Sequence, residues 1–206
     1  YINATLEQSY GNIYIQELDG YTELLVKYGS LDAFKLNYSD EDNPNLIKLA
    51  YSEARIGYVA ALTGNIKYSK LSLRKTDMMK AESAYSEYIL GNTGSLEIDG
   101  KYDKLNIEKL NGKLLLESAY TNVKVQEVSD TFTALELDMK YGNFTGELSG
   151  SPSFSIEAEV NYGNIDVPDG NLQVVKDGMS QLVDGTVGNG SGVVKVDMKY
   201  GNFSFK

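Results

Sequence analysis

The residues of this sequence best suited to chemistry are carboxylates that alternate with apolar residues in short runs. Nine of them lie on the polar phase of the alternation: Glu97, Asp99, Glu108, Glu117, Glu136, Asp138, Glu157, Glu159 and Asp166. Glycoside hydrolysis uses such a pair, one carboxyl as general acid and the other as base or nucleophile. A separate acidic run, Asp40-Glu41-Asp42, offers the hard oxygen ligands that Ca²⁺ prefers. A polysaccharide-cleaving pair and a calcium loop are therefore two chemistries to weigh.

Simpler explanations fit both groups of acids. A solvated strand face must be polar, so alternation alone supplies the outward carboxylates, and lysines are interleaved with them. The acidic run is followed by Pro44 and lacks the alternating acids and the glycine of a calcium loop. The sequence contains no histidine and no cysteine, which excludes an imidazole base, a thiolate nucleophile and Cys/His zinc sites. We therefore predict a protein that is not an enzyme, with no catalytic, metal-binding or cofactor-binding residues.

Composition limits the partners and the organisation of the chain. Its 206 residues suffice for one domain, residues 1–206, with a substantial core. The net charge of −10 disfavours nucleic acid and anionic lipid as partners. No apolar run approaches the roughly 20 residues of a transmembrane helix, so we expect no membrane span in this segment. The chain begins at Tyr1 and not at methionine, which suggests an exported and processed protein.

A tyrosine recurs along the whole chain and marks an internal repeat. The repeating positions are Tyr10, Tyr28, Tyr51, Tyr68, Tyr85, Tyr102, Tyr120, Tyr141, Tyr162 and Tyr200. Most intervals are 17 to 23 residues, and the last, 38 residues, is interpreted as two coils with one tyrosine lost. Periods of this length indicate a solenoid.

The residues around each tyrosine predict a corner. The residue after it is always Gly, Ser, Asp or Thr, and Asn follows in five of the ten cases. Gly and Asn tolerate the left-handed backbone that a sharp corner needs. The third residue after the tyrosine is apolar in ten cases of ten. Because the apolar period changes from two to three at this point, the chain must bend to keep these residues on one side, around an interior.

These observations predict an all-β, single-domain fold, a right-handed parallel β-helix or β-solenoid. We expect about nine to ten coils of 17–23 residues, with two or three short strands in each. Residues 168–191 break the period and are predicted to cap one end, as a hairpin or an irregular coil, because an open last coil exposes strand edges. A leucine-rich repeat is the nearest competitor, but its asparagine position does not recur here.

The apolar phase also predicts where the tyrosine rings point. The rings share the alternation of Leu, Val and Met, so we expect them to pack in the interior, as a structural ladder. The alternative is a carbohydrate-binding face, since aromatic rings pack against sugars. Two aromatic residues off this phase, Tyr14 and Tyr58, are better candidates for an exposed surface.

The corner motifs resemble those of a family of bacterial cell-envelope domains described as adhesins and of unknown function. The resemblance rests on Tyr141-Gly142-Asn143-Phe144, Tyr162-Gly163-Asn164-Ile165 and Tyr200-Gly201-Asn202-Phe203, together with the glycine-rich segment 188–193. It implies an exported β-helix without catalytic residues, placed in the bacterial periplasm or on the cell surface. The coils of Tyr51, Tyr68, Tyr85 and Tyr102 lack the Gly-Asn pair and so depart from the pattern.

The sequence therefore predicts a non-enzymatic binding or structural module of the cell envelope that presents the faces of a β-helix to a glycan or protein partner. A polysaccharide-cleaving enzyme that uses outward carboxylates is the alternative.

Overall fold

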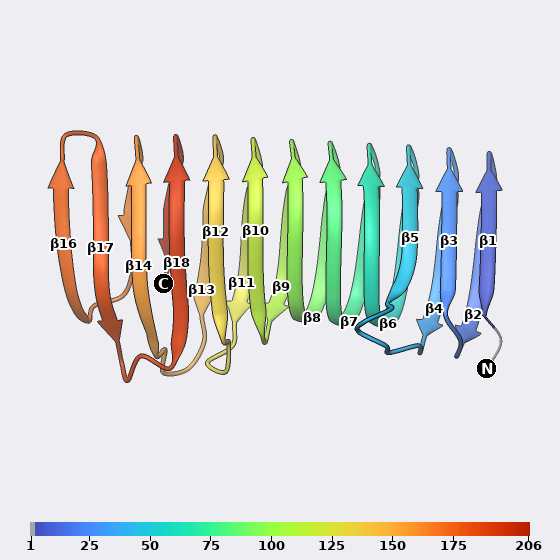
Figure 1. Cartoon of the computed structure of the whole chain (residues 1–206), viewed down its shortest axis with the longest axis horizontal. Coiled ribbons are helices and arrows are strands. Elements are labelled where there is room, and N and C mark those ends of the chain that lie inside the picture. The colour runs from blue at the N-terminus through green and yellow to red at the C-terminus, as the bar shows by residue number, and fades with distance from the viewer. Residues whose placement is uncertain (1–2) are drawn as a thin grey trace.

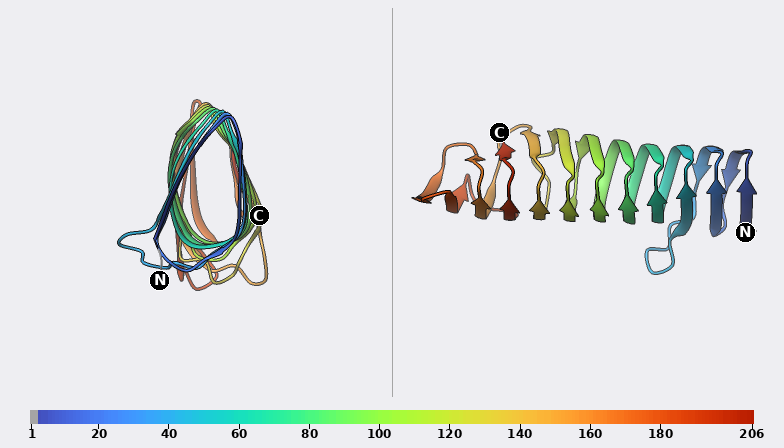
Figure 2. Two further views of the ribbon diagram at one scale, coloured as in Figure 1. Left: turned by 90° about the vertical axis from the view of Figure 1, so that its right-hand side faces the viewer. Right: turned by 90° about the horizontal axis from the view of Figure 1, so that it is seen from above.

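The chain folds into the β-solenoid that the sequence predicts. The computed structural model describes residues 3–206; Tyr1 and Ile2 lie outside the described part. Strands make up 72% of the chain, no helix occurs among residues 3–206, and the solenoid has about eight turns. Its cross-section is a flattened oval, so each coil contributes to two broad faces, here called face A and face B (Figures 1 and 2).

Face A consists of the strand segments that run into the repeating tyrosines. Three long strands contribute to both faces, with their second halves on face A: β6 (Glu53–Lys67), β7 (Lys70–Ala84) and β8 (Glu87–Lys101). The others on face A are β1 (Ala4–Ser9), β3 (Thr22–Lys27), β5 (Asn45–Ala50), β10 (Lys113–Ala119), β12 (Ala134–Lys140), β14 (Phe154–Asn161), β16 (Asn171–Asp177), β17 (Ser180–Val187) and β18 (Gly192–Lys199).

Face B consists of the segments that follow the tyrosines. It contains the first halves of β6, β7 and β8, paired in parallel register with their neighbours. The remaining strands are β2 (Asn12–Leu18), β4 (Ser30–Leu36), β9 (Lys104–Leu110), β11 (Asn122–Val128), β13 (Phe144–Leu148), β15 (Ile165–Asp166) and β19 (Phe203–Phe205).

The interior is filled by the apolar residues whose alternation predicted it. Along β12, Leu135, Leu137 and Met139 are each at most 3% exposed, and the residues between them face solvent. The third residue after each repeating tyrosine also points inward, as Leu71 and Phe144 do in their coils. Parallel register stacks these residues on their counterparts in the next coil, so one continuous core runs along the solenoid.

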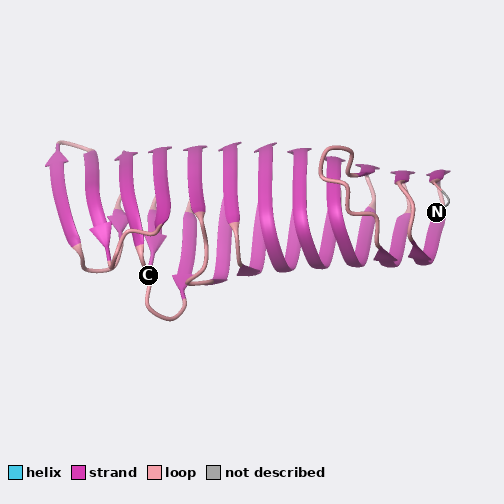
Figure 3. Ribbon diagram, turned by 60° about the horizontal axis from the view of Figure 1, so that its bottom comes forward, coloured by secondary structure: helices cyan, strands magenta, loops and turns pink. Residues whose placement is uncertain are grey.

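Each coil turns at two corners, the tyrosine corner and a second one that we call the loop corner. Strands β6, β7 and β8 pass the loop corner without a break, whereas neighbouring coils turn there through loops (Figure 3). Residues 74–80, which carry charges of both signs, belong to the continuous strand β7. Residues 39–45, which contain the acidic run, lengthen one coil at this corner and project from the solenoid (Figure 2). Buried Asn45 anchors the loop by donating to the carbonyls of Tyr38 and Ala61, each at 3.0 Å.

The last coil lies inside the stack and not at its end, which corrects the expectation of a lost tyrosine. Strand β18 pairs in parallel with β12 on one side and with β14 on the other (Figure 1). Strand β19 is likewise placed between β13 and β15. The 38-residue interval thus contains a detour to the end of the solenoid and a returning strand, and not two coils with one tyrosine lost between them.

The detour caps the carboxyl-terminal end, as predicted for residues 168–191. Strands β16 and β17 form an antiparallel hairpin, and β17 pairs antiparallel with β14. Buried Gln181 pairs with the backbone of Ile165 in β15: its Oε1 accepts from the N–H at 3.0 Å and its Nε2 donates to the carbonyl at 3.4 Å. This amide replaces a missing strand at the end of face B.

The position of the last coil can be tested by disulfide trapping in this cysteine-free chain. Lys199 is in register with Lys140 on one side and Asn161 on the other. Neighbouring strands lie about 4.8 Å apart, within the Cα separation that a disulfide tolerates. We expect Lys140→Cys with Lys199→Cys, and Asn161→Cys with Lys199→Cys, to form intramolecular disulfides under mild oxidation, detected by mass spectrometry. The pair Lys140→Cys with Asn161→Cys should stay reduced; its efficient oxidation would show that the coils stack in sequence order.

Candidate binding surfaces

The repeating tyrosines themselves adopt the left-handed backbone at the corner. All ten have positive φ, between 51° and 60°, whereas the glycines that follow some of them do not. The expectation that Gly or Asn supplies this conformation is therefore wrong. A left-handed conformation is uncommon for a residue with a Cβ, and costs about 1–2 kcal/mol. The conformational cost of ten such tyrosines must be offset by other interactions.

The tyrosine rings face solvent, which corrects the prediction that they pack in the interior. Their exposed fractions run from 43% at Tyr28 to 80% at Tyr10. The residue after each tyrosine occupies the inward position instead, as buried Ser52 and Ser69 show. The change of period shows that one extra residue is present at the corner, but it does not show whether that residue is the tyrosine or its successor. The residue after each tyrosine is always small, and this is the sequence signal that this residue, and not the tyrosine, lies inside the corner.

The rings form one continuous stack along the rod. Nine neighbouring pairs have centroid distances of 4.6–5.2 Å and interplanar angles of 2–12°. Tyr200 stacks between Tyr141 and Tyr162, in agreement with the inserted coil. Because each ring covers the face of the next, the ladder presents ring edges and hydroxyl groups to solvent. Sugar packing on ring faces, which the alternative prediction required, is restricted to the two ends.

Inside the corner, buried side chains replace the hydrogen bonds that the bend removes from the backbone ladder. The N–H of Ser52 donates to Oγ of Ser69 at 3.1 Å, and the N–H of Ser69 donates to Oγ of Ser86 at 3.3 Å. Asp103 and Thr121 continue this series in the next coils, with distances of 2.7 and 3.2 Å. The sequence showed small residues here, and the structure shows that each must also accept a hydrogen bond.

The Gly-Asn corners use a different ladder. Oδ1 of Asn143 accepts from the backbone N–H and the side-chain amide of Asn202, at 3.0 and 3.1 Å, and Asn202 serves Asn164 in the same way. The preceding glycine is required by close packing, since a Cβ on Gly142 would lie 1.9 Å from the carbonyl oxygen of Thr121. Both corner types join successive coils and keep them in register.

Asp103 is the one carboxylate in the buried corner series. It is 4% exposed, and its Oδ2 accepts from Oγ of Ser83 at 2.5 Å. Gly100 leaves room for it, because a Cβ there would lie 2.3 Å from Oδ2. Burial raises the pKa of Asp103, while the hydrogen bonds from Ser83 and from the N–H of Ser86 partly oppose this effect.

Face A carries a row of carboxylates at neighbouring register positions. In spatial order the row is Glu82, Asp99, Glu117, Asp138, Asp197 and Glu159. All six are exposed, and within residues 3–206 none has a Lys or Arg at ion-pair distance. The sequence identified four of them; Glu82 and Asp197 join them only through the coil register and the inserted strand. The surface over this row is a shallow groove of about 900 Å³.

The remaining predicted acids are separated from this row. Glu97 pairs with Lys80 at 2.6 Å, and Lys195 lies between Glu136 and Glu157 in a neighbouring row. Glu108 and Asp166 lie on face B, where Asp166 pairs with Lys206 at 2.5 Å. In the projecting loop, Oδ1 of Asp40 accepts from the N–H of Asp42 at 3.0 Å, which forms a turn. Among the described residues no group of three or more acidic side chains is arranged to hold a metal ion.

A groove of about 970 Å³ crosses seven coils of face B. One wall is a row that begins with Tyr14 and includes Arg55, and the other includes Phe34 and Arg74. Tyr14 is 74% exposed and Phe34 is 60% exposed, so two large aromatic side chains face solvent at one end of the groove. The two arginines are the only ones in the chain. Exposure of Tyr14 confirms the sequence prediction; no sequence signal connected it with Phe34 or the arginines, because they meet only through the coil register.

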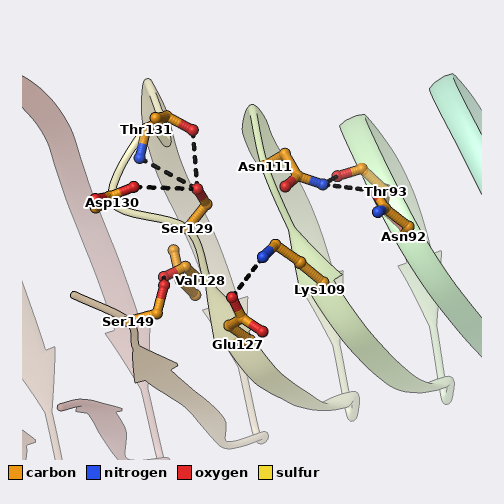
Figure 4. A network of polar contacts seen from close by, with 10 residues as sticks. All are labelled: Asn92, Thr93, Lys109, Asn111, Glu127, Val128, Ser129, Asp130, Thr131 and Ser149. Carbon is orange, nitrogen blue, oxygen red and sulfur yellow. Dashed lines mark hydrogen bonds and ion pairs between the residues drawn. The ribbon is translucent and has the colours of Figure 1, made fainter.

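Polar side chains beside this groove are largely satisfied by each other. Tyr58 is half-buried, and its hydroxyl donates to Oδ2 of Asp77 at 2.7 Å, which raises the pKa of Tyr58 to about 12. Near the loop corner, Nζ of Lys109 lies 2.6 Å from Glu127, and Asn111 donates to Oδ1 of Asn92 at 2.7 Å (Figure 4). These contacts join successive coils and stiffen the edge of the groove.

Comparison with protein-family models, curated proteins and solved structures found no match to this chain. The resemblance to bacterial adhesin domains therefore stays a prediction from the corner motifs. Within the described residues there is no helix with the length and apolar character needed to cross a membrane.

The outward stack predicts that removing a tyrosine ring lowers the free energy of unfolding by an amount that depends on how many rings stack on it. Tyr85→Ala removes two contacts, at 4.9 and 4.6 Å, whereas Tyr10→Ala removes one, at 5.2 Å. At about 0.5–1.5 kcal/mol per pair, we expect the free energy of unfolding to fall by about 1–3 kcal/mol for Tyr85→Ala and about half of that for Tyr10→Ala, measured by urea denaturation. Tyr85→Asn should lower the free energy of unfolding less than Tyr85→Ala does, because Asn tolerates the left-handed region. Equal losses at both positions would contradict a stack that contributes to stability.

The raised pKa of Asp103 predicts that removing its charge raises the free energy of unfolding, by an amount that depends on pH. Because its pKa is raised in the folded state, its ionisation opposes folding once the pH exceeds the ordinary value of an aspartate. Asp103→Asn keeps an acceptor for Ser86 and should raise the free energy of unfolding at pH 7. The gain should shrink as the pH falls through the raised pKa of Asp103 and should vanish below about 4, the ordinary value of an aspartate. Asp99→Asn, on the surface of the same coil, controls for net charge; a gain of equal size and pH dependence there would refute the role of burial.

Proposed function

We propose that this chain is a non-enzymatic binding or structural module of a bacterial cell envelope, exported to the periplasm or cell surface, which presents a face of the solenoid to a glycan or protein partner. The observation that carries the proposal is the groove on face B. It is long and straight because the coil register aligns equivalent outward positions, from Tyr14 in the first coil to Gln126 in the seventh. Such a surface suits an extended partner.

The composition of the groove supports contact with a partner. Tyr14, Phe34 and Ile89 are exposed along it, the last by 41%, although a solvated strand face is normally polar. A run of exposed apolar side chains bordered by polar ones is typical of an interaction surface. The floor is backbone and the walls are side chains anchored on rigid strands, so little conformational entropy is lost on binding.

A polysaccharide-cleaving enzyme is the second candidate, and the carboxylate row on face A is the observation that favours it. Adjacent members such as Glu117 and Asp138 are register neighbours, with backbones about 4.8 Å apart, close to the separation of the carboxyl pair in retaining glycosidases. All members are solvent-exposed, however, and no neighbouring residue distinguishes one as an acid. We therefore place this candidate second.

The proposal predicts that binding depends on the aromatic end of the groove. We expect the chain to bind at least one member of a panel of envelope glycans and surface proteins, measured by glycan array and pull-down. The double variant Tyr14→Ser with Phe34→Ser should weaken that binding at least tenfold, because it removes the exposed rings. Val193→Ser, an exposed apolar position on face A, is the matched control and should bind as the unchanged chain does.

A blank panel would count against the proposal. Release of reducing ends or unsaturated products from any polysaccharide tested would contradict it and favour the carboxylate row.

A further inference from the structure

We infer that the groove on face B binds a linear glycan in which a carboxylate-bearing sugar is flanked on each side by at least two neutral sugars, with Arg74 as the anion-binding residue and Phe34 as a platform for a neutral sugar. This inference rests on the proposed binding function and deepens it, because it assigns the ligand class and the contacting residues.

Arg74 is a cation without a partner at the centre of the groove. Its guanidinium makes no ion pair within residues 3–206, whereas Arg55 is engaged by Glu53 at 2.8 Å and Asp32 at 3.5 Å. An exposed guanidinium recognises a carboxylate through two parallel hydrogen bonds, with a fixed geometry that lysine lacks. Arg55 is locally neutralised, and Arg74 remains available for an anionic ligand.

Glycines on both sides keep Arg74 accessible. The register of β6, β7 and β8 places Gly57 beside it in one neighbouring coil and Gly91 in the other. Gly91 packs close to Arg74, since a Cβ there would lie 2.3 Å from the Arg74 carbonyl oxygen. With no side chain in either adjacent coil at this row, a ligand group can approach the guanidinium along the groove.

Phe34 offers what the tyrosine ladder does not, an aromatic ring with free faces. It is 60% exposed, and no aromatic ring of the described residues stacks on it. The same holds for Tyr14, which is 74% exposed. The apolar face of a pyranose packs on such a ring. Phe34 and Arg74 lie two coils apart, about 9.6 Å along the rod, the length of about two sugar units, so the sugar on Phe34 is the second one along the chain from the sugar at Arg74.

The other charged residues of the groove disfavour a ligand with an acid on every sugar. Glu108 lies two coils beyond Arg74 and would repel a carboxylate at its position, while Asp32, beside Phe34, shares Arg55 with Glu53 and leaves no free cation for a carboxylate there. Between and beyond them the walls offer Ser72, Asn106 and Gln126, which hydrogen-bond neutral sugars. The charges therefore match an anionic group at Arg74 with neutral units on either side.

Calorimetric titration with two matched ligands tests this assignment. One is a pentasaccharide with a central glucuronate and two N-acetylglucosamine units on each side, and the other is the same pentasaccharide with its carboxylate reduced to an alcohol. We expect the acidic form to bind the unchanged protein at least fivefold more tightly, with an affinity that falls as salt is added. Arg74→Gln should remove this preference, and Phe34→Ser should weaken both ligands. Lys140→Gln, an exposed cation on face A, is the control and should change neither affinity.

The outcomes separate this inference from the proposed function. Equal affinity for the two pentasaccharides, or a preference that survives Arg74→Gln, would overturn the assignment of Arg74 and leave glycan binding intact. Binding of a protein or an acidic peptide, with no binding of either pentasaccharide, would overturn the glycan ligand and retain a binding module. No binding of any ligand in the titrations or the panel would refute both.

Discussion

The tyrosine corner is the constraint on which the rest of the structure depends. In every coil one tyrosine accepts a left-handed backbone, at a cost of about 1–2 kcal/mol, and its ring stacks on the rings of the adjacent coils, which returns about 0.5–1.5 kcal/mol per pair. The same conformation turns the ring outward and places the next residue inward. That inward residue must be small: it either accepts a hydrogen bond, as Ser69 and Asp103 do, or is a glycine, as Gly201 is before the laddered Asn202. One backbone choice thus fixes the corner, the register and the identity of its neighbours.

Much of this fold could be predicted from the sequence, because a solenoid repeats its constraints. The period, the apolar third position and the break at 168–191 were sufficient for the coils, the core and the cap. The orientation of the tyrosines was predicted wrongly, because periodicity counts an extra residue at a corner without showing which residue it is. The order of the last coils was also inaccessible, since β18 returns between β12 and β14 through pairing that no local pattern encodes.

The functional surfaces follow from the register more than from any motif. On face A, Asp197 joins the row of Glu82 and Asp99 only through the inserted strand. On face B, Phe34 and Arg74 line the same wall of the groove, although they belong to coils that are far apart in sequence. The two aromatic arrays differ in kind. In the ladder each ring covers its neighbour, so the rings stabilise the rod, whereas Phe34 and Tyr14 keep free faces and suit contact with a ligand. The conspicuous repeat builds the protein, and a less regular surface is the better candidate for binding.

The most direct test of the outward corner is chemical nitration of the folded protein, with the modified tyrosines mapped by mass spectrometry. Tyr14, which is 74% exposed, and Tyr88, which is 0% exposed, serve as internal references for free and buried rings. The structure predicts that Tyr51, Tyr85 and Tyr120, about half exposed, are modified at rates nearer to that of Tyr14, while Tyr88 stays unmodified until the protein unfolds. Protection of the three ladder tyrosines to the level of Tyr88 would show that the rings point inward and would contradict the account of the corner.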